Sequence, residues 1–104
     1  MTRELKLDCE VRGTRAEMSV TGDLDMAAAF KLEPEIEHVV RENAVDELVL
    51  DLSDVSFIDS AGVGSLLSSR ERLNVLGVRT TIARPSRPVQ RVLDATGADD
   101  LLLS

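Results

Sequence analysis

The chain is poor in aromatic residues and in cysteine, and each shortage excludes a class of function. Among its 104 residues there is no tryptophan or tyrosine, and phenylalanine occurs only twice. Sequence-independent binding of single-stranded nucleic acid uses aromatic side chains on which bases stack, so that activity is effectively excluded. The single cysteine, Cys9, allows neither an internal disulfide nor a cysteine cluster for zinc. This cysteine content is typical of a reducing environment, so we expect a cytoplasmic protein.

Long apolar runs and an excess of positive charge are also missing. No stretch approaches the ~20 apolar residues of a transmembrane helix, and the start, MTRELKLDCE, lacks the apolar core of a signal peptide. The formal net charge is -7, from 19 acidic and 12 basic side chains. That balance argues against a surface for DNA phosphates or for an anionic membrane, and it suits a basic protein partner. The length predicts one domain, 1–104, with one aliphatic core.

The strand patterns predict an α/β fold with a small, mixed, mostly parallel sheet. Apolar and polar residues alternate over Leu5–Val11 and over Ala16–Thr21, which predicts a hairpin of half-buried strands that turns at Gly13. The apolar run within Glu47–Leu52 is typical of a strand covered on both faces. A further strand is expected at Val78–Ala83. Strands that alternate with helices give right-handed crossovers and parallel pairs, so about four or five strands should form the sheet.

Three main helices are expected, and the first contains an obstacle. Pro34 deep inside a helix would cost ~3 kcal/mol, so we expect a loose first turn followed by a helix from about Glu33 to Asn43, with a kinked helix as the alternative. The second helix should begin at Asp59 or Ser60, because both residue types are good N-caps.

The remaining signals lie in loops and at the carboxyl end. A polar loop is expected at Ser53–Ser56, after which Phe57 and Ile58 should return the chain to the core. Pro88 suits the first position of the third helix, and Gly97 should end it. The run Leu101–Leu103 would be a short closing strand or an apolar tail on the core.

The stretch Leu48–Leu67 organises the candidate site. If the strands are parallel, the loops that follow them emerge at one edge of the sheet, where ligands and partners dock in α/β proteins. Ser60 lies at this edge, at the head of a helix. The residues expected around it come from the loops after the other strands: Asp23 and Asp25 on one side, and Arg84 and Arg87 on another.

Little chemistry is available at this edge. A serine nucleophile needs a base, and the only histidine, His38, lies on the first helix, away from the edge. No nucleophile elbow, P-loop lysine or complete dinucleotide fingerprint is present. The carboxylates of Asp23, Asp25, Asp51 and Asp59 are of the kind that holds Mg²⁺, but helix caps, solvated loop charges and interface charges are the simpler interpretation. We therefore expect no enzyme activity, no cofactor and no bound metal.

Ser60 itself has two interpretations. As a plain N-cap it would stabilise the helix by ~1 kcal/mol. As a phosphorylation site it would gain about -1.5 to -2 charges, which the helix dipole favours and nearby aspartates oppose. The fold should survive that modification, whereas a partner pressed against the site should be released. The chemistry of the residues leaves both interpretations open.

Three blocks carry a resemblance to a known family. They are GDLD at Gly22–Asp25, LVLDLSDVSFIDSAGVGSLL at Leu48–Leu67, and PSRPVQRVLDATG at Pro85–Gly97. Together they resemble the STAS domain of anti-sigma factor antagonists. The resemblance covers nearly the whole chain, and the D-S-x-G block is its most specific part.

The resemblance implies a phosphorylation-controlled switch. Such antagonists bind an anti-sigma factor that is also a serine kinase of the ATPase fold, and this binding frees the sigma factor. The kinase then phosphorylates the serine of D-S-x-G, the complex dissociates, and a phosphatase resets it. Carried over to this chain, the phosphate acceptor is Ser60, and the partner-binding residues are Asp23, Asp25, Asp59, Ser60, Ala61 and Gly62. The alternative is a STAS interaction module of another signalling or lipid-transport assembly, without the switch.

Overall fold

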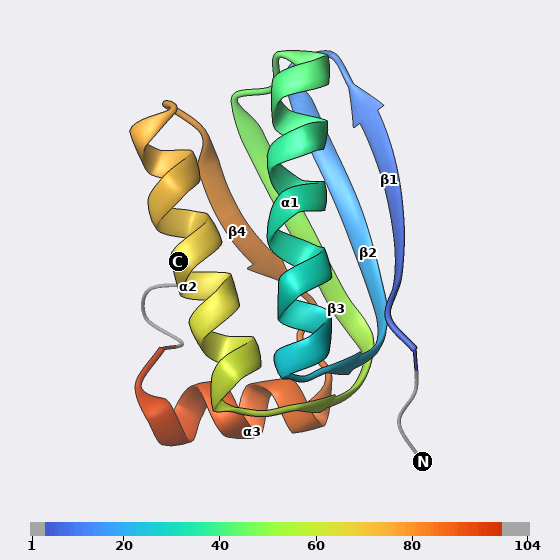
Figure 1. Ribbon diagram of the computed structural model, residues 1–104, viewed down its shortest axis with the longest axis vertical. Coiled ribbons are helices and arrows are strands. Elements are labelled where there is room, and N and C mark those ends of the chain that lie inside the picture. The colour runs from blue at the N-terminus through green and yellow to red at the C-terminus, as the bar shows by residue number, and fades with distance from the viewer. Residues whose placement is uncertain (1–3, 99–104) are drawn as a thin grey trace.

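The computed structural model describes residues 4–98 and confirms an α/β fold (Figure 1). Its elements, in chain order, are β1 (Lys6–Arg12), β2 (Arg15–Leu24), α1 (Met26–Asn43), β3 (Glu47–Ile58), α2 (Ser60–Val75), β4 (Arg79–Ala83) and α3 (Arg87–Thr96). The predicted Leu101–Leu103 element lies outside the described residues.

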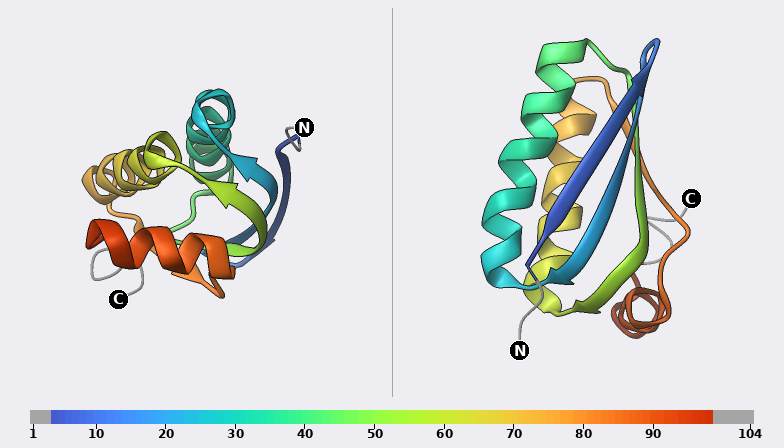
Figure 2. Two further views of the ribbon diagram at one scale, coloured as in Figure 1. Left: turned by 90° about the horizontal axis from the view of Figure 1, so that it is seen from below. Right: turned by 90° about the vertical axis from the view of Figure 1, so that its right-hand side faces the viewer.

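The described strands form one mixed, mostly parallel sheet, as predicted. The spatial order is β1-β2-β3-β4, with β1 antiparallel to β2 and the other two pairs parallel. Because β2, β3 and β4 follow one another in one direction across the sheet, right-handed crossovers put α1 and α2 on the same face. Figure 2 shows these two helices side by side on that face, with α3 across the opposite face at the carboxyl end of the strands.

The core lies between the sheet and the pair α1 and α2. Alternate residues of β2 and β3, such as Met18, Leu48 and Leu50, are almost fully buried there, as Leu32 and Ile36 of α1 are. Burial of an aliphatic side chain of this size is worth ~1.5–3 kcal/mol, so this layer supplies most of the stability of the fold.

Two strand predictions are wrong. β1 was expected to be half-buried, but it is an edge strand in which Cys9 and Val11 are exposed. The polar segment Ser53–Ser56 was expected to be a loop, yet β3 continues through it to Ile58. Pairing with the end of β2 extends β3, since Thr21–Leu24 stays hydrogen-bonded to it across two irregularities in register.

The prediction for α1 is wrong in its starting point. The helix begins at Met26 and runs without interruption past Pro34. Pro34 lies on the exposed side of the helix, while Leu32, Ile36 and Val39 face the core. Burial of that apolar face outweighs the hydrogen bond that a proline cannot donate.

The ends of α2 and α3 follow the sequence signals closely. After α2, the Gly77 N–H donates to Asn74 O at 3.0 Å and the Val78 N–H donates to Leu73 O at 2.8 Å. Gly77 takes the left-handed conformation that this Schellman motif requires. α3 begins at Arg87, one residue before the predicted Pro88, and ends at Gly97 with a φ of 74°.

Candidate functional site

The head of α2 presents Ser60 to solvent. Asp59, rather than Ser60, is the N-cap, because its Oδ1 accepts a hydrogen bond from the Gly62 N–H at 2.9 Å. Ser60 is the first residue of the helix, and it is exposed. Within residues 4–98 its hydroxyl has no hydrogen-bond partner. Of the two roles that the sequence left open for Ser60, capping therefore belongs to Asp59.

Pairing of β2 with β3 brings the first acidic segment beside this serine, as expected from the parallel strands. In the register of the sheet, Asp23 is opposite Phe57 and Leu24 is opposite Ile58. The Asp59 N–H approaches Leu24 O at 3.5 Å. Consequently Asp23 and Asp25 lie next to the start of α2.

Asp25 has the same structural role at α1 that Asp59 has at α2. Its Oδ1 accepts a hydrogen bond from the Ala28 N–H at 3.0 Å. Both carboxylates are partly buried, and both lie at the positive ends of helix dipoles, where a negative charge is stabilised by ~0.3–1 kcal/mol. The site thus has two capped helix heads side by side, with Ser60 exposed on one of them.

Gly62 sets the distance between the two helix heads. The residue is buried, and a Cβ atom built on it would collide with the Leu24 carbonyl oxygen and lie 2.8 Å from Ile58 Cγ1. Only glycine lets the first turn of α2 approach the backbone of β2 this closely. Ala61, its neighbour, is partly exposed.

Arg84 does not reach this site, which corrects the expectation that the loop after β4 emerges beside Ser60. β4 ends at Ala83, opposite Asp51, and Asp51 precedes Asp59 by about eight residues of strand, or ~26 Å. The Arg84 Nη2 donates to Asp51 Oδ2 at 2.6 Å and lies 3.4 Å from Glu17 Oε1. Arg84 is therefore bound to the polar face of the sheet.

The carboxylate of Asp51 is stabilised in its ionised form by these contacts. Burial acts to raise its pKa, but hydrogen bonds from the Ser53 N–H and Oγ outweigh that effect, together with the hydrogen bond and charge of Arg84. The net result is that the pKa of Asp51 lies below its ordinary value.

Arg87 starts α3 as an exposed residue, on the opposite face of the sheet from α2.

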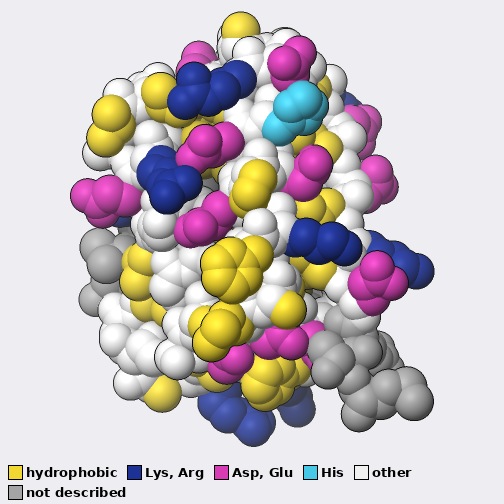
Figure 3. All heavy atoms as spheres, in the orientation of Figure 1, with side chains coloured by type: hydrophobic (Ala, Val, Ile, Leu, Met, Phe, Trp, Pro, Cys, Tyr) yellow, Lys and Arg dark blue, Asp and Glu magenta, His cyan; other side chains and the backbone are white. Residues whose placement is uncertain are grey.

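Sequence reasoning missed an apolar component near the site. Phe57 was expected in the core but is 49% exposed, while Met26 and Phe30 on α1 are 62% and 76% exposed. Figure 3 shows hydrophobic and acidic side chains together over the lower part of this face. Helical spacing offered a signal for Phe30, because it is two residues from both Ala28 and Leu32 and so lies opposite the buried stripe.

A shallow hollow adjoins the aspartates. It has a volume of ≈ 310 Å³, and both Asp23 and Asp25 line it, together with Leu5 and Lys31. Its position at the starts of α1 and β1 makes it part of the same edge. The hollow gives the edge a concave, acidic region next to the exposed apolar side chains.

The single histidine of the sequence lies far from Ser60. His38 is an exposed residue about 12 positions along α1 from Met26, which corresponds to ~18 Å of helix. Within residues 4–98 no group of three histidine, cysteine, aspartate or glutamate side chains is placed to hold a metal ion. The helices described over the same residues are all too short or too polar to cross a membrane.

Fold and site define a small α/β domain in which an acidic edge surrounds an exposed serine at a helix head. The STAS domain family model matches residues 6–103, which is nearly the entire sequence. The chain belongs to the STAS domain family.

Three relatives with which the chain shares sequence or structure are antagonists of anti-sigma factors. It is 26% identical over 78 residues to the anti-sigma F factor antagonist of Paenibacillus polymyxa, covering 75% of this chain and 67% of that protein. It is 30% identical over 89 residues to the anti-sigma-B factor antagonist of Staphylococcus epidermidis, covering 83% and 79%. The solved structure of the anti-sigma factor antagonist SpoIIAA in its unphosphorylated form superimposes with a TM-score of 0.78 at 25% identity, over 96% of this chain and 86% of that one.

Proposed function

We propose that this protein is an anti-sigma factor antagonist controlled by phosphorylation of Ser60. In its unphosphorylated form it binds an anti-sigma factor that is a serine kinase of the ATPase fold, and the sigma factor is thereby released. Phosphorylation of Ser60 by that kinase ends the complex, and a phosphatase restores the hydroxyl. The protein acts by binding, without catalysis, in the cytoplasmic setting that its single cysteine suggests.

The observation that carries this proposal is the free hydroxyl of Ser60. An exposed serine at a helix start is usually occupied in capping, which would make it a structural residue. Here the Asp59 carboxylate caps the helix, and Ser60 is left exposed without a hydrogen-bond partner in residues 4–98. A kinase can therefore modify the hydroxyl without removing a contact that the fold uses.

The electrostatics of the edge explain why the modified protein would stay folded. A phosphate brings about -1.5 to -2 charges to the positive end of the α2 dipole, which is favourable by ~0.3–1 kcal/mol. Repulsion from Asp59 and Asp23 across solvent is of similar size and opposite sign. The two effects nearly cancel, so the free energy of unfolding should change by less than ~1 kcal/mol.

A bound partner would respond much more strongly. The partner would cover Ser60 and exclude water from it. A phosphate dianion buried there beside two aspartates would lose its solvation without gaining a positively charged group, and this would weaken binding. Each tenfold loss of affinity corresponds to about 1.4 kcal/mol, so repulsion of a few kcal/mol is enough to dissociate the complex.

The proposed partner surface follows from the composition of the edge. Met26, Phe30 and Phe57 offer exposed apolar area, and the hollow beside them is lined by Asp23 and Asp25. A complementary partner would present apolar side chains next to lysine or arginine. Gly62 would act indirectly, since its lack of a side chain keeps the two helix heads together.

The test compares substitutions at Ser60 with a charge control elsewhere. Ser60→Ala should bind the anti-sigma factor kinase and resist dissociation by ATP, while Ser60→Glu should bind at least about tenfold more weakly. Ala95→Glu adds the same charge at an exposed position of α3 and should bind like the wild type. Affinities are measured by calorimetry, and the phosphosite by mass spectrometry after incubation with kinase and ATP.

Two results would remove the proposal. Equal affinities of Ser60→Ala and Ser60→Glu would show that charge at this position does not control binding. If the protein binds the kinase but Ser60 carries no phosphate after incubation with kinase and ATP, the protein would be a STAS interaction module that lacks the switch.

A further inference from the structure

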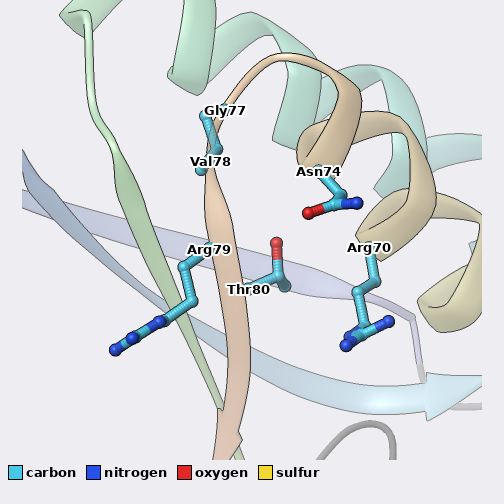
Figure 4. Close-up of a pocket in the computed structure, with 6 residues that line it drawn as sticks. All are labelled: Arg70, Asn74, Gly77, Val78, Arg79 and Thr80. Carbon is cyan, nitrogen blue, oxygen red and sulfur yellow. The ribbon is translucent and has the colours of Figure 1, made fainter.

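A second site candidate lies at the other end of α2, in a cleft between the end of that helix and β4. Figure 4 shows the six residues that line it, and the cleft has a volume of ≈ 350 Å³. The lining residues are Arg70, Asn74, Gly77, Val78, Arg79 and Thr80. None of them is acidic, although the chain as a whole carries a net charge of -7.

The first observation that points to a ligand is a buried hydroxyl without a partner. Thr80 is only 6% exposed, and its Oγ1 makes no hydrogen bond within residues 4–98. In Figure 4 this oxygen points toward the side chain of Asn74, across the cleft. Buried polar groups in native proteins nearly always bind a protein group, a water molecule or a ligand, so the unpaired Thr80 hydroxyl is available to a group that enters the cleft.

The second observation is an arginine that has no ion pair. Arg72, two residues further along α2, binds Glu37 at 2.9 Å, and Arg84 binds Asp51. Arg70 has no such partner among residues 4–98, although it is partly buried at the cleft. Its guanidinium lies on the same side of β4 as Thr80, whereas Arg79 extends toward the other side (Figure 4).

The hydrogen bonding at the C-terminal end of α2 reduces its repulsion of an anion. The negative end of a helix dipole would normally repel one. Here the Leu73 and Asn74 carbonyls accept hydrogen bonds from the N–H groups of Val78 and Gly77, which offset part of the negative charge at this end of the helix. The donors that remain at the cleft are the Arg70 guanidinium, the Thr80 hydroxyl and the Asn74 amide.

We propose that this cleft binds a small oxyanion, namely inorganic phosphate or the phosphoryl group of a larger molecule. The guanidinium of Arg70 supplies the charge and two parallel N–H donors, and the Thr80 hydroxyl and Asn74 amide complete the contacts. Arg70 and Asn74 follow Ser60 by 10 and 14 residues of α2, which correspond to ~15 and ~21 Å of helix. The site is therefore independent of the proposed switch.

The experiment is a titration with inorganic phosphate that is monitored by two-dimensional NMR and by thermal unfolding. A parallel titration with sodium chloride at the same ionic strength is the control. Saturable shifts are expected in the amide signals of Asn74 and Gly77–Thr80, with an increase in Tm that chloride does not produce. Arg70→Gln should raise the Kd at least about tenfold. Thr80→Val, which keeps the shape and removes the hydroxyl, should weaken binding while raising the Tm without phosphate.

Matched controls separate binding from general effects of charge and burial. Ser69→Ala removes the other buried hydroxyl that lacks a partner in residues 4–98, but Ser69 does not line the cleft, so phosphate binding should not change. Arg72→Gln removes the same charge two residues further along α2, outside the lining of the cleft, and should also retain binding. Titration with adenosine 5′-monophosphate distinguishes the two sources: tighter binding through the same residues identifies a phosphorylated organic molecule. Linear, unsaturable shifts, or undiminished binding by Arg70→Gln, would overturn the proposal.

Discussion

Gly62 provides a sharp test of how the site is held together, because Gly64 in the same helix is a matched control. A methyl group at Gly62 would collide with the Leu24 carbonyl oxygen and with Ile58, whereas a methyl group at Gly64 has no neighbour within 4 Å. Both positions belong to α2 and have helical backbone angles. The two alanine variants therefore differ in sterics and hardly at all in helix propensity.

The magnitudes follow from these contacts. Alanine is favoured over glycine inside a helix by ~1 kcal/mol, so Gly64→Ala should raise the free energy of unfolding by up to that amount. Overpacking costs ~1–3 kcal/mol and occasionally more, and the obstacle at Gly62 is backbone, which cannot rotate away. Because the propensity gain is common to both variants, Gly62→Ala should be less stable than Gly64→Ala by about 1–3 kcal/mol. For a domain of this size each kcal/mol shifts the Tm by ~4–8 °C.

The assay is urea unfolding followed by circular dichroism, with thermal unfolding as a second measurement. The steric clash should also displace the first turn of α2, so the NMR signals of Asp59 and Ser60 should shift in Gly62→Ala and remain in place in Gly64→Ala. Similar stabilities for the two variants would refute the reasoning, since they would show that the start of α2 is free to move away from Leu24.

Three further outcomes are expected. Asp59→Ala should lower the free energy of unfolding, measured by urea denaturation, by ~1 kcal/mol. Asp59→Asn should change it little, because asparagine can also cap a helix. Equal losses of stability in the two variants would exclude a capping role for Asp59. Because the pKa of Asp51 is lowered by folding, its ionised form stabilises the protein above pH ~4, and this stabilisation is lost as the pH falls through the lowered value. The free energy of unfolding of the wild type minus that of Asp51→Asn should therefore be larger at pH 7 than at pH 3, and a difference that does not change with pH would contradict the lowering of the Asp51 pKa by Ser53 and Arg84. Phe30→Ser should change the stability by less than ~0.5 kcal/mol yet weaken binding of the anti-sigma factor, because Phe30 is exposed.

The fold class and the position of the site were predictable from local signals. Alternation of apolar and polar residues indicates a strand, and an aspartate before a glycine-containing helix start indicates a helix N-terminus. Gly77 and Gly97 indicate helix C-termini. Each of these signals depends only on residues close to one another in the sequence. The parallel order of the strands then predicted that Asp23 and Asp25 would lie beside Ser60. The register of β2 on β3 confirms that prediction.

Errors arose where a distant contact outweighs a local signal. Ser53–Ser56 is polar and resembles a loop, but hydrogen bonds to β2 hold it as strand. Pro34 resembles a helix breaker, but the buried face of α1 holds the helix together around it. Arg84 follows its strand as the pattern predicts, but β4 is too short to carry it to the edge where Ser60 lies.

The sequence by itself determined that this is a small α/β domain with a serine at a helix head, because caps, turns and periodicity depend on neighbouring residues. Only the tertiary structure decided which side chain caps that helix. Gly62 lets α2 press against Leu24, Asp59 takes the N–H of Gly62, and the hydroxyl of Ser60 is left to solvent. The approach of Gly62 to Leu24 depends on how closely two segments more than 30 residues apart can pack, and packing across such a separation is not encoded in any short pattern.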